Sequence, residues 1–108
     1  MLKKWGFYIV LLKGRQFKIK VLYFKKGGQI SMQRHKHRSE TWFFIFGSGL
    51  FTKMFNSGVR TCTPVSKGDC VFVDDYEWHH YKAIRRTLVI EAQVGAWCEE
   101  SDIERICA

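Results

Sequence analysis

The chain has 108 residues, of which 46% are hydrophobic and 16% aromatic. This is enough for one packed core, and it excludes a disordered chain. The formal net charge of +8 favours an anionic partner, but the basic residues are scattered in small groups without a nucleic-acid motif, so we expect no nucleic-acid ligand. No apolar run approaches the roughly 18 residues of a bilayer span, so we also expect no membrane contact.

Short segments rich in Val, Ile, Phe and Tyr recur along the chain, and their alternation is typical of strands. In chain order the predicted strands are Phe7 to Leu12, Phe17 to Phe24, Trp42 to Phe46, Leu50 to Phe55, Val59 to Thr63, Cys70 to Val73, His79 to Ala83 and Leu88 to Ala92. About eight evenly spaced strands predict an all-β sandwich or barrel. The tail EESDIERI, residues 99–106, is the one segment with a helical pattern.

The polar stretch QISMQRHKHRSE precedes the apolar run that starts at Trp42. On a strand, Gln33, His35 and His37 would share one face, because side chains two apart point the same way. Glu40 has the opposite parity, so it can join them only after a bend at residues 38–39. The alternative without a functional role is that His35 and His37 are solvent-facing residues of a basic loop.

All four histidines fall in two clusters, and the second, His79 with His80, begins a later strand. A metal ion needs three or four N and O donors from different strands, because a single strand cannot surround it. The four cysteines include no C-x-x-C pair, which argues against a zinc ribbon or a disulfide framework. A reducing cytoplasm is therefore the expected location.

Two stretches, GGQISMQRHKHRSETWFFIFGSG and KGDCVFVDDYEWHHYKA, resemble the two motifs of the cupin superfamily. In the first motif, a metal-binding pair spaced two apart is followed three or four residues later by Glu and then, after six more residues, by Gly. Glu40 and Gly47 fit the second interval. The resemblance implies that Gln33, His35, Glu40 and, from the second motif, His79 are the metal ligands.

The context SMQRHKHRSETW resembles more specifically the C-terminal mannose-6-phosphate isomerase domain of bifunctional isomerase/mannose-1-phosphate guanylyltransferases. The resemblance runs from KKWGFYIVL to VIEAQVGAWCEESDIERI, so the chain would be a free-standing isomerase-like unit. It implies a single cupin domain over residues 1–108, a double-stranded β-helix or jelly-roll barrel with a short C-terminal helical tail. A divalent metal ion would lie inside, zinc first, with manganese, cobalt, nickel or iron as alternatives.

The implied function in carbohydrate metabolism is isomerisation of the sugar phosphate mannose 6-phosphate to fructose 6-phosphate. Moving a proton between C1 and C2 requires a Lewis acid on the oxygens and a base nearby. His37 or His80 could be the base, and the sequence does not choose between them. Arg38 by a bidentate fork, and Lys36 as a point charge, would hold the phosphate.

Three departures from the family pattern favour a second hypothesis. Lys36 and Thr41 each replace a histidine, and Asp74, Asp75 and Tyr76 replace a Pro-x-Gly turn. The alternative is a non-catalytic metal-binding cupin that binds a sugar or a nucleotide-sugar. A metal-dependent dioxygenase is disfavoured, because such sites more often lack a Gln ligand.

Assembly can also be predicted from the apolar segments. Both faces of residues 42–46 are apolar, and the first strand, Phe7 to Leu12, is apolar throughout. Apolar residues on both faces suit burial on both sides of a strand. We therefore expect a homodimer.

Overall fold

The computed structural model describes residues 1–96, 98 and 102–106 of the chain. The regular secondary structure of this part consists of β-strands. No helix long and apolar enough to span a membrane is found in it. The strands are β1 (Leu2–Lys3), β2 (Gly6–Lys13), β3 (Phe17–Phe24), β4 (Met32–Arg34), β5 (Arg38–Phe46), β6 (Ser48–Met54), β7 (Arg60–Ser66), β8 (Cys70–Val73), β9 (Trp78–Ala83), β10 (Thr87–Gly95) and β11 (Glu104–Ile106).

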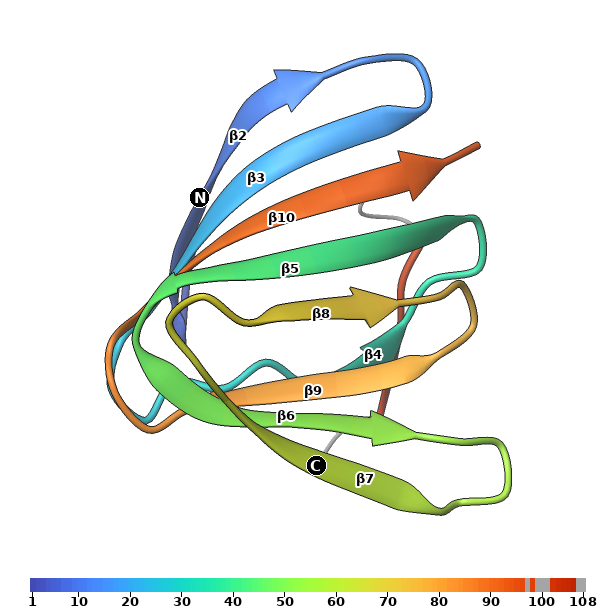
Figure 1. Ribbon diagram of the computed structural model, residues 1–108. Helices are drawn as coiled ribbons and strands as arrows, with labels where there is room; N and C mark the ends of the chain where they lie inside the picture. The colour runs from blue at the N-terminus through green and yellow to red at the C-terminus, as the bar shows by residue number, and fades with distance from the viewer. Residues whose placement is uncertain (97, 99–101, 107–108) are drawn as a thin grey trace.

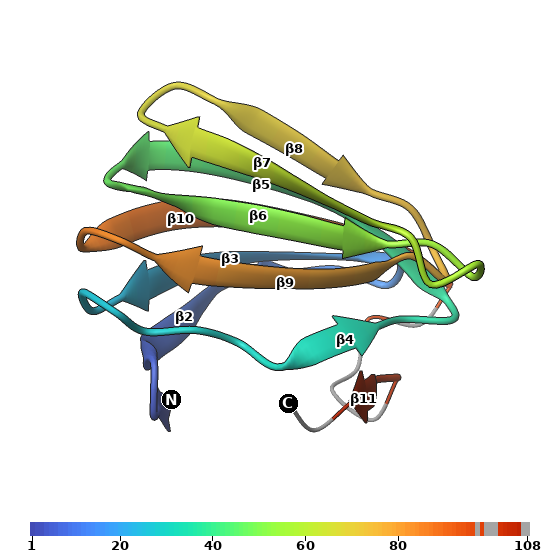
Figure 2. The ribbon, with the colours of Figure 1, turned by 90° about the horizontal axis from the view of Figure 1, so that it is seen from below.

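The strands form two sheets that face each other (Figures 1 and 2). One sheet has the order β1-β2-β3-β10-β5-β8 and the other the order β11-β4-β9-β6-β7. The strand pairs are antiparallel, and strands far apart in sequence, such as β3 and β10, are neighbours. The all-β jelly-roll prediction is therefore confirmed, with the core between the two sheets.

All eight predicted strands are present, as β2, β3 and β5 to β10, and two of them, β3 and β8, have the predicted bounds. The predicted helical tail is wrong where it can be compared. Residues 104–106 form β11 and pair with β4, while residues 99–101 lie outside the described part. A helix of two turns is marginal on its own. In a helix this short most backbone N–H and C=O groups are unpaired, whereas pairing with the edge of β4 gives them partners.

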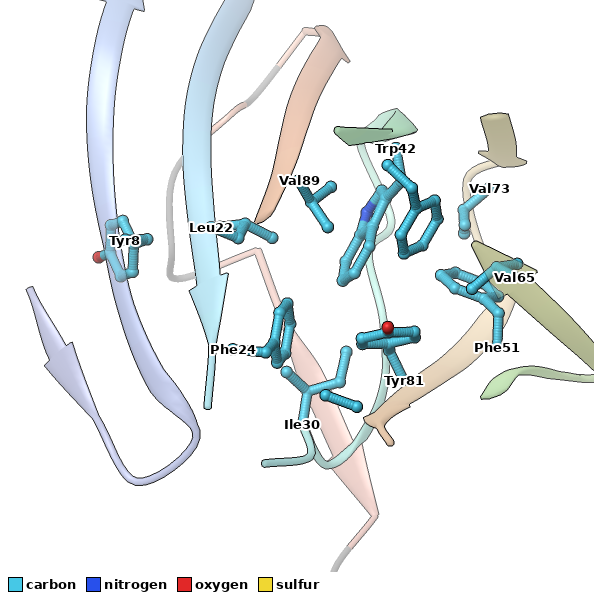
Figure 3. Close-up of a cluster of buried hydrophobic side chains, with 12 residues drawn as sticks. Tyr8, Leu22, Phe24, Ile30, Trp42, Phe51, Val65, Val73, Tyr81 and Val89 are labelled. Atoms are coloured by element: carbon cyan, nitrogen blue, oxygen red, sulfur yellow. The ribbon is translucent and has the colours of Figure 1, made fainter. Parts of the chain in front are cut away.

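Alternation along β5 separates the core from the outer surface. Trp42 and Phe44 are 1% and 2% exposed, whereas Phe43 and Ile45 are 44% and 41% exposed. Figure 3 shows the aromatic rings of the core turned toward one another from both sheets. Trp42 and Phe51 meet edge to face, with ring centroids 5.3 Å apart, a geometry that adds to the burial of their area.

Gly47, the last residue of the first sequence motif, connects β5 to β6 with a φ of 100°. This is a conformation that L side chains rarely adopt. A Cβ at this position would also meet the backbone oxygen of Arg86. The fold therefore requires glycine at this turn.

Candidate metal centre

Three predicted ligands converge inside the barrel. His35 directly follows β4, Glu40 lies on β5 and His79 on β9, so both sheets contribute. One donor atom from each lies within 4.8 Å of those from the other two. The three residues are 4%, 2% and 0% exposed, so His35 is not a solvent-facing loop residue.

The two imidazoles are oriented as metal ligands usually are. Nδ1 of His35 lies 2.7 Å from the backbone oxygen of Asp102, and Nδ1 of His79 lies 3.3 Å from that of Glu77. A carbonyl oxygen only accepts, so each Nδ1 donates to it, and Nε2 is the nitrogen that faces the other predicted ligands. Ligating histidines are commonly fixed through the other nitrogen in this way.

Both Nε2 atoms face the Glu40 carboxyl group. They lie 3.1 Å (His35) and 3.4 Å (His79) from its oxygens, and Nε2 of His79 is buried without a hydrogen-bond partner. Burial would raise the pKa of Glu40, but the neighbouring imidazoles hold that pKa well below its usual range. A carboxylate and two imidazole nitrogens aimed at one point fit a divalent cation.

Arg38 lies within this cluster. Its Nε donates to Oε2 of Glu40 at 3.1 Å, and its Nη2 is 3.2 Å from Nε2 of His35. Trp42 Nε1 donates to the other Glu40 oxygen at 3.3 Å. Arg38 was predicted to bind phosphate, but its guanidinium group, 2% exposed, is engaged with the proposed metal ligands.

A cavity of about 280 Å³ opens beside the cluster. Its lining includes His35, Arg38 and Glu40. Gln33, the fourth predicted ligand, lines it too and is the register partner of His79 between β4 and β9. The Gln-x-His pair chosen from the sequence therefore borders the same space.

The predicted alternation through His37 is wrong. β4 ends at Arg34, and the chain bends at residues 36–37, before the predicted bend at residues 38–39. The reason is a local hydrogen-bond pattern: the backbone N–H groups of Lys36 and His37 donate to the Asp102 carboxylate at 3.1 and 2.9 Å. His37 is exposed, and Lys36 is exposed with its ammonium 2.7 Å from Glu104.

His80 also lies outside the metal cluster. It follows His79 on β9 and points to the opposite face, where its Nε2 is 3.1 Å from Oε1 of Gln29. Burial and, less strongly, the charge of Arg60 lower its pKa. Neither His37 nor His80 is among the residues that line the cavity, so the structure does not bring the two candidate bases to it.

Lys20 and Glu91 are cavity residues that the sequence interpretation missed. They are register partners on β3 and β10, and they are 4% and 5% exposed. Burial and, next, the Glu40 charge raise the pKa of Glu91 to about 8, and Gln93 donates to its Oε1 at 2.6 Å. A signal was present: Lys20 has the parity of Leu22 in an alternating strand, where an apolar residue is expected.

Comparisons with known proteins identify the family of this chain. The family described as "Mannose-6-phosphate isomerase C-terminal" matches residues 1–108. A mannose-1-phosphate guanylyltransferase from Sinorhizobium fredii is 26% identical over 108 residues, covering 98% of this chain and 20% of the relative. The chain spans about a fifth of the length of the curated relatives that it matches.

Solved structures share the fold at low identity. A Klebsiella pneumoniae protein with a double-stranded β-helix domain has a TM-score of 0.75 at 15% identity, covering 92% of this chain and 82% of its own. Oxalate decarboxylase from Bacillus subtilis, described with Mn(II) centres, has a TM-score of 0.73 at 16% identity, covering 85% and 24%. This chain therefore belongs to the family described as mannose-6-phosphate isomerase C-terminal.

Proposed function

We propose that the protein is a metal-dependent isomerase that interconverts mannose 6-phosphate and fructose 6-phosphate. The observation that carries the proposal is the convergence of His35, Glu40 and His79 beside a small cavity. These residues, with Gln33, would hold a divalent ion, either zinc or the manganese of the decarboxylase relative. When bound, such an ion supplies a Lewis acid that polarises the oxygens on C1 and C2 of the sugar.

Residues of the chain would orient the ligands, exclude water and move the proton. Arg38 holds the Glu40 carboxylate in place through its 3.1 Å hydrogen bond. Trp42 and Leu22 line the cavity and keep water from part of it. Glu91 replaces the two histidines as the candidate for moving the proton between C2 and C1, because it lines the cavity outside the ligand set. A carboxyl group with a pKa near the working pH can both accept and return a proton.

Cavity size favours a monosaccharide phosphate over a nucleotide-sugar. The volume of about 280 Å³ lies just below the roughly 300–1,000 Å³ of typical ligand pockets. The alternative function, a non-catalytic cupin that binds a sugar, is favoured by the turn at Tyr76, which carries a φ of 62° where the family pattern has glycine. That turn contacts the site, since its backbone N–H donates to the His35 carbonyl at 2.7 Å.

A coupled assay for fructose 6-phosphate, run on protein loaded in turn with zinc, manganese, cobalt and nickel, tests the proposal. Wild-type protein should turn over mannose 6-phosphate. His35→Ala should lose both metal and turnover, whereas Glu91→Gln should keep the metal and lose kcat, because its amide cannot accept the proton. His80→Gln is the control and should keep both. If wild-type protein binds sugar but shows no turnover with any of these metals, the isomerase proposal is wrong and the protein is a binding module.

The homodimer and the cytoplasmic location stay predictions. β2 supports the homodimer, because Ile9 and Leu11 are 52% and 58% exposed. On its outer side β2 pairs, in the described part, only with the two residues of β1. Light scattering should show a dimer in wild-type protein and a monomer in Leu11→Lys. A monomeric wild-type protein at micromolar concentration would contradict this.

A further inference from the structure

Exposed and buried cations line the cavity, while its acids are buried. The cationic residues that line it away from the metal cluster are Lys3, Lys4, Lys20 and Arg105. They come from β1, the turn after it, β3 and β11, and Figure 2 shows the N-terminal segment and β11 on the same side of the molecule. The acidic residues of the lining, Glu40 and Glu91, are 2% and 5% exposed. Lys3, Lys4 and Arg105 are exposed, so an anion that enters from solvent meets these three charges before the buried Lys20, Glu40 and Glu91.

Two of these cations, Lys3 and Lys20, lie near the ring of Tyr8. The ammonium of Lys20 lies 4.3 Å, and that of Lys3 5.8 Å, from the centroid of Tyr8. A ring face attracts each ammonium group, but the two like charges repel each other. Lys20 is 4% exposed, so water screens its charge little. An anion between the two ammonium groups would neutralise both.

The sheet registers connect the cations to the metal ligands. Arg105 pairs with Gln33, which pairs with His79, so Arg105 lies two strand spacings, roughly 10 Å, from a ligand. In the other sheet, Lys20 is next to Glu91. The phosphorus of an extended hexose 6-phosphate lies on the order of 7 Å from C2, given bonds of about 1.5 Å. The long side chain of Arg105 can cover the difference between the roughly 10 Å backbone separation and this distance of about 7 Å.

We propose that Lys3, Lys4, Lys20 and Arg105 form a phosphate subsite that holds the phosphate monoester of the sugar while C1 and C2 lie at the metal cluster. This inference rests on the proposed function and assigns the phosphate to residues other than those predicted from the sequence. Arg38 is engaged with Glu40, and Lys36 is paired with Glu104 outside the cavity.

Calorimetry on metal-loaded protein tests the subsite with three probes: mannose 6-phosphate, mannose and inorganic phosphate. The double variant Lys3→Gln/Lys4→Gln should bind mannose 6-phosphate and phosphate about tenfold more weakly, because charge-assisted hydrogen bonds are lost. Mannose affinity should change less than twofold. Arg105→Gln should behave in the same way. The matched control is Lys25→Gln/Lys26→Gln, two exposed lysines outside the cavity, which should bind all three probes as wild-type protein does.

The outcomes separate this inference from the proposed function. If wild-type protein isomerises the sugar and the subsite variants keep wild-type affinity for mannose 6-phosphate and phosphate, the subsite is overturned and the function stands. If no isomerisation occurs but phosphate affinity falls only in the subsite variants, the subsite stands and the isomerase fails. If wild-type protein binds mannose 6-phosphate no better than mannose, the subsite is overturned. Lys20 is buried, so Lys20→Met could fail to fold. The test of the subsite therefore uses the variants at the exposed residues Lys3, Lys4 and Arg105.

Discussion

The inside of the barrel has an apolar end and a polar end, and the same strands build both. The apolar end consists of Leu22, Phe24, Phe44, Tyr81 and Val89, and the polar end of Lys20, His35, Glu40, His79 and Glu91. Along β10 the inward residues change from Val89 to Glu91 within two positions, while both stay at 5% exposure or less. Burial therefore does not distinguish the two ends. What differs is how each buried group is compensated.

At the apolar end, burial itself stabilises the fold, at about 1.5–3 kcal/mol for a large side chain. At the polar end, burial is unfavourable unless each group finds a partner. Glu40 has its partners in Arg38 and Trp42, and Glu91 has Gln93. Substitutions at the apolar end should therefore reduce stability alone, whereas substitutions at the polar end should also change metal binding or pH dependence.

The largest effect is expected at Phe24, which is 0% exposed and stacks with Trp5 at a centroid distance of 4.5 Å. Phe24→Ala should lower the free energy of unfolding by about 3–5 kcal/mol, because it leaves a cavity among aromatic rings. Urea unfolding measures this. The control, Phe55→Ala, removes a ring that is 46% exposed and should cost less than about 1 kcal/mol. Equal losses in the two variants would contradict burial as the source of stability at the apolar end.

Arg38 tests the compensation at the polar end. In metal-free protein, Arg38→Met should destabilise the fold by about 3 kcal/mol, because it leaves the Glu40 carboxylate buried without a cation. The loss lies at the low end for a broken buried pair, because Glu40 can take up a proton. Saturating zinc should restore part of the stability, as a ligand that binds only the folded state does. If zinc stabilises wild-type protein but not this variant, Arg38 is needed to build the site.

The alternation of strands was predictable, but the partners of the polar end were not. Val89 and Phe24 lie inside as their periodicity indicates. Asp102 fixes His35 across 67 positions through a backbone oxygen, a contact that has no signature in residue type. It also ends the predicted alternation at His37 by binding the backbone of the bend. Local patterns therefore predicted the ligands, and long-range pairing decided which neighbouring residues join them.

Glu91 sets the next prediction, which concerns pH in metal-free protein. Its pKa is raised from 4.5 to about 8, so between these values the folded state holds a proton that the unfolded state has released. Stability from this group is therefore highest below pH 4.5 and falls as the pH rises toward 8. Each pH unit contributes at most about 1.36 kcal/mol, so wild-type protein should lose roughly 2 kcal/mol between pH 5.5 and 7.5.

The matched comparison for this pH effect is Glu91→Gln. Both proteins keep the other charged groups near position 91, which are Glu40, Lys20 and Arg38. The difference between their stability curves therefore isolates the carboxyl group. Urea unfolding at pH 5.5, 6.5 and 7.5 should show the fall in wild-type protein and a flatter curve in Glu91→Gln. Parallel curves would mean that Glu91 is ionised in the folded protein.

The last comparison concerns two turns, one at each end, and its smallest expected effect is at Tyr76. Gly47 forms the turn at the apolar end with a φ of 100°, while Tyr76, beside the polar end, has a φ of 62° with a side chain that disfavours it. Tyr76→Gly should relieve this strain and stabilise the protein by about 0.5–1 kcal/mol, after the loss of a ring 5.9 Å from the Arg34 guanidinium. Gly47→Ala should have the opposite sign, because its Cβ meets the backbone. Urea unfolding of both variants measures the pair, and a Tyr76→Gly protein less stable than wild type would show that the ring contacts outweigh the strain at the polar end.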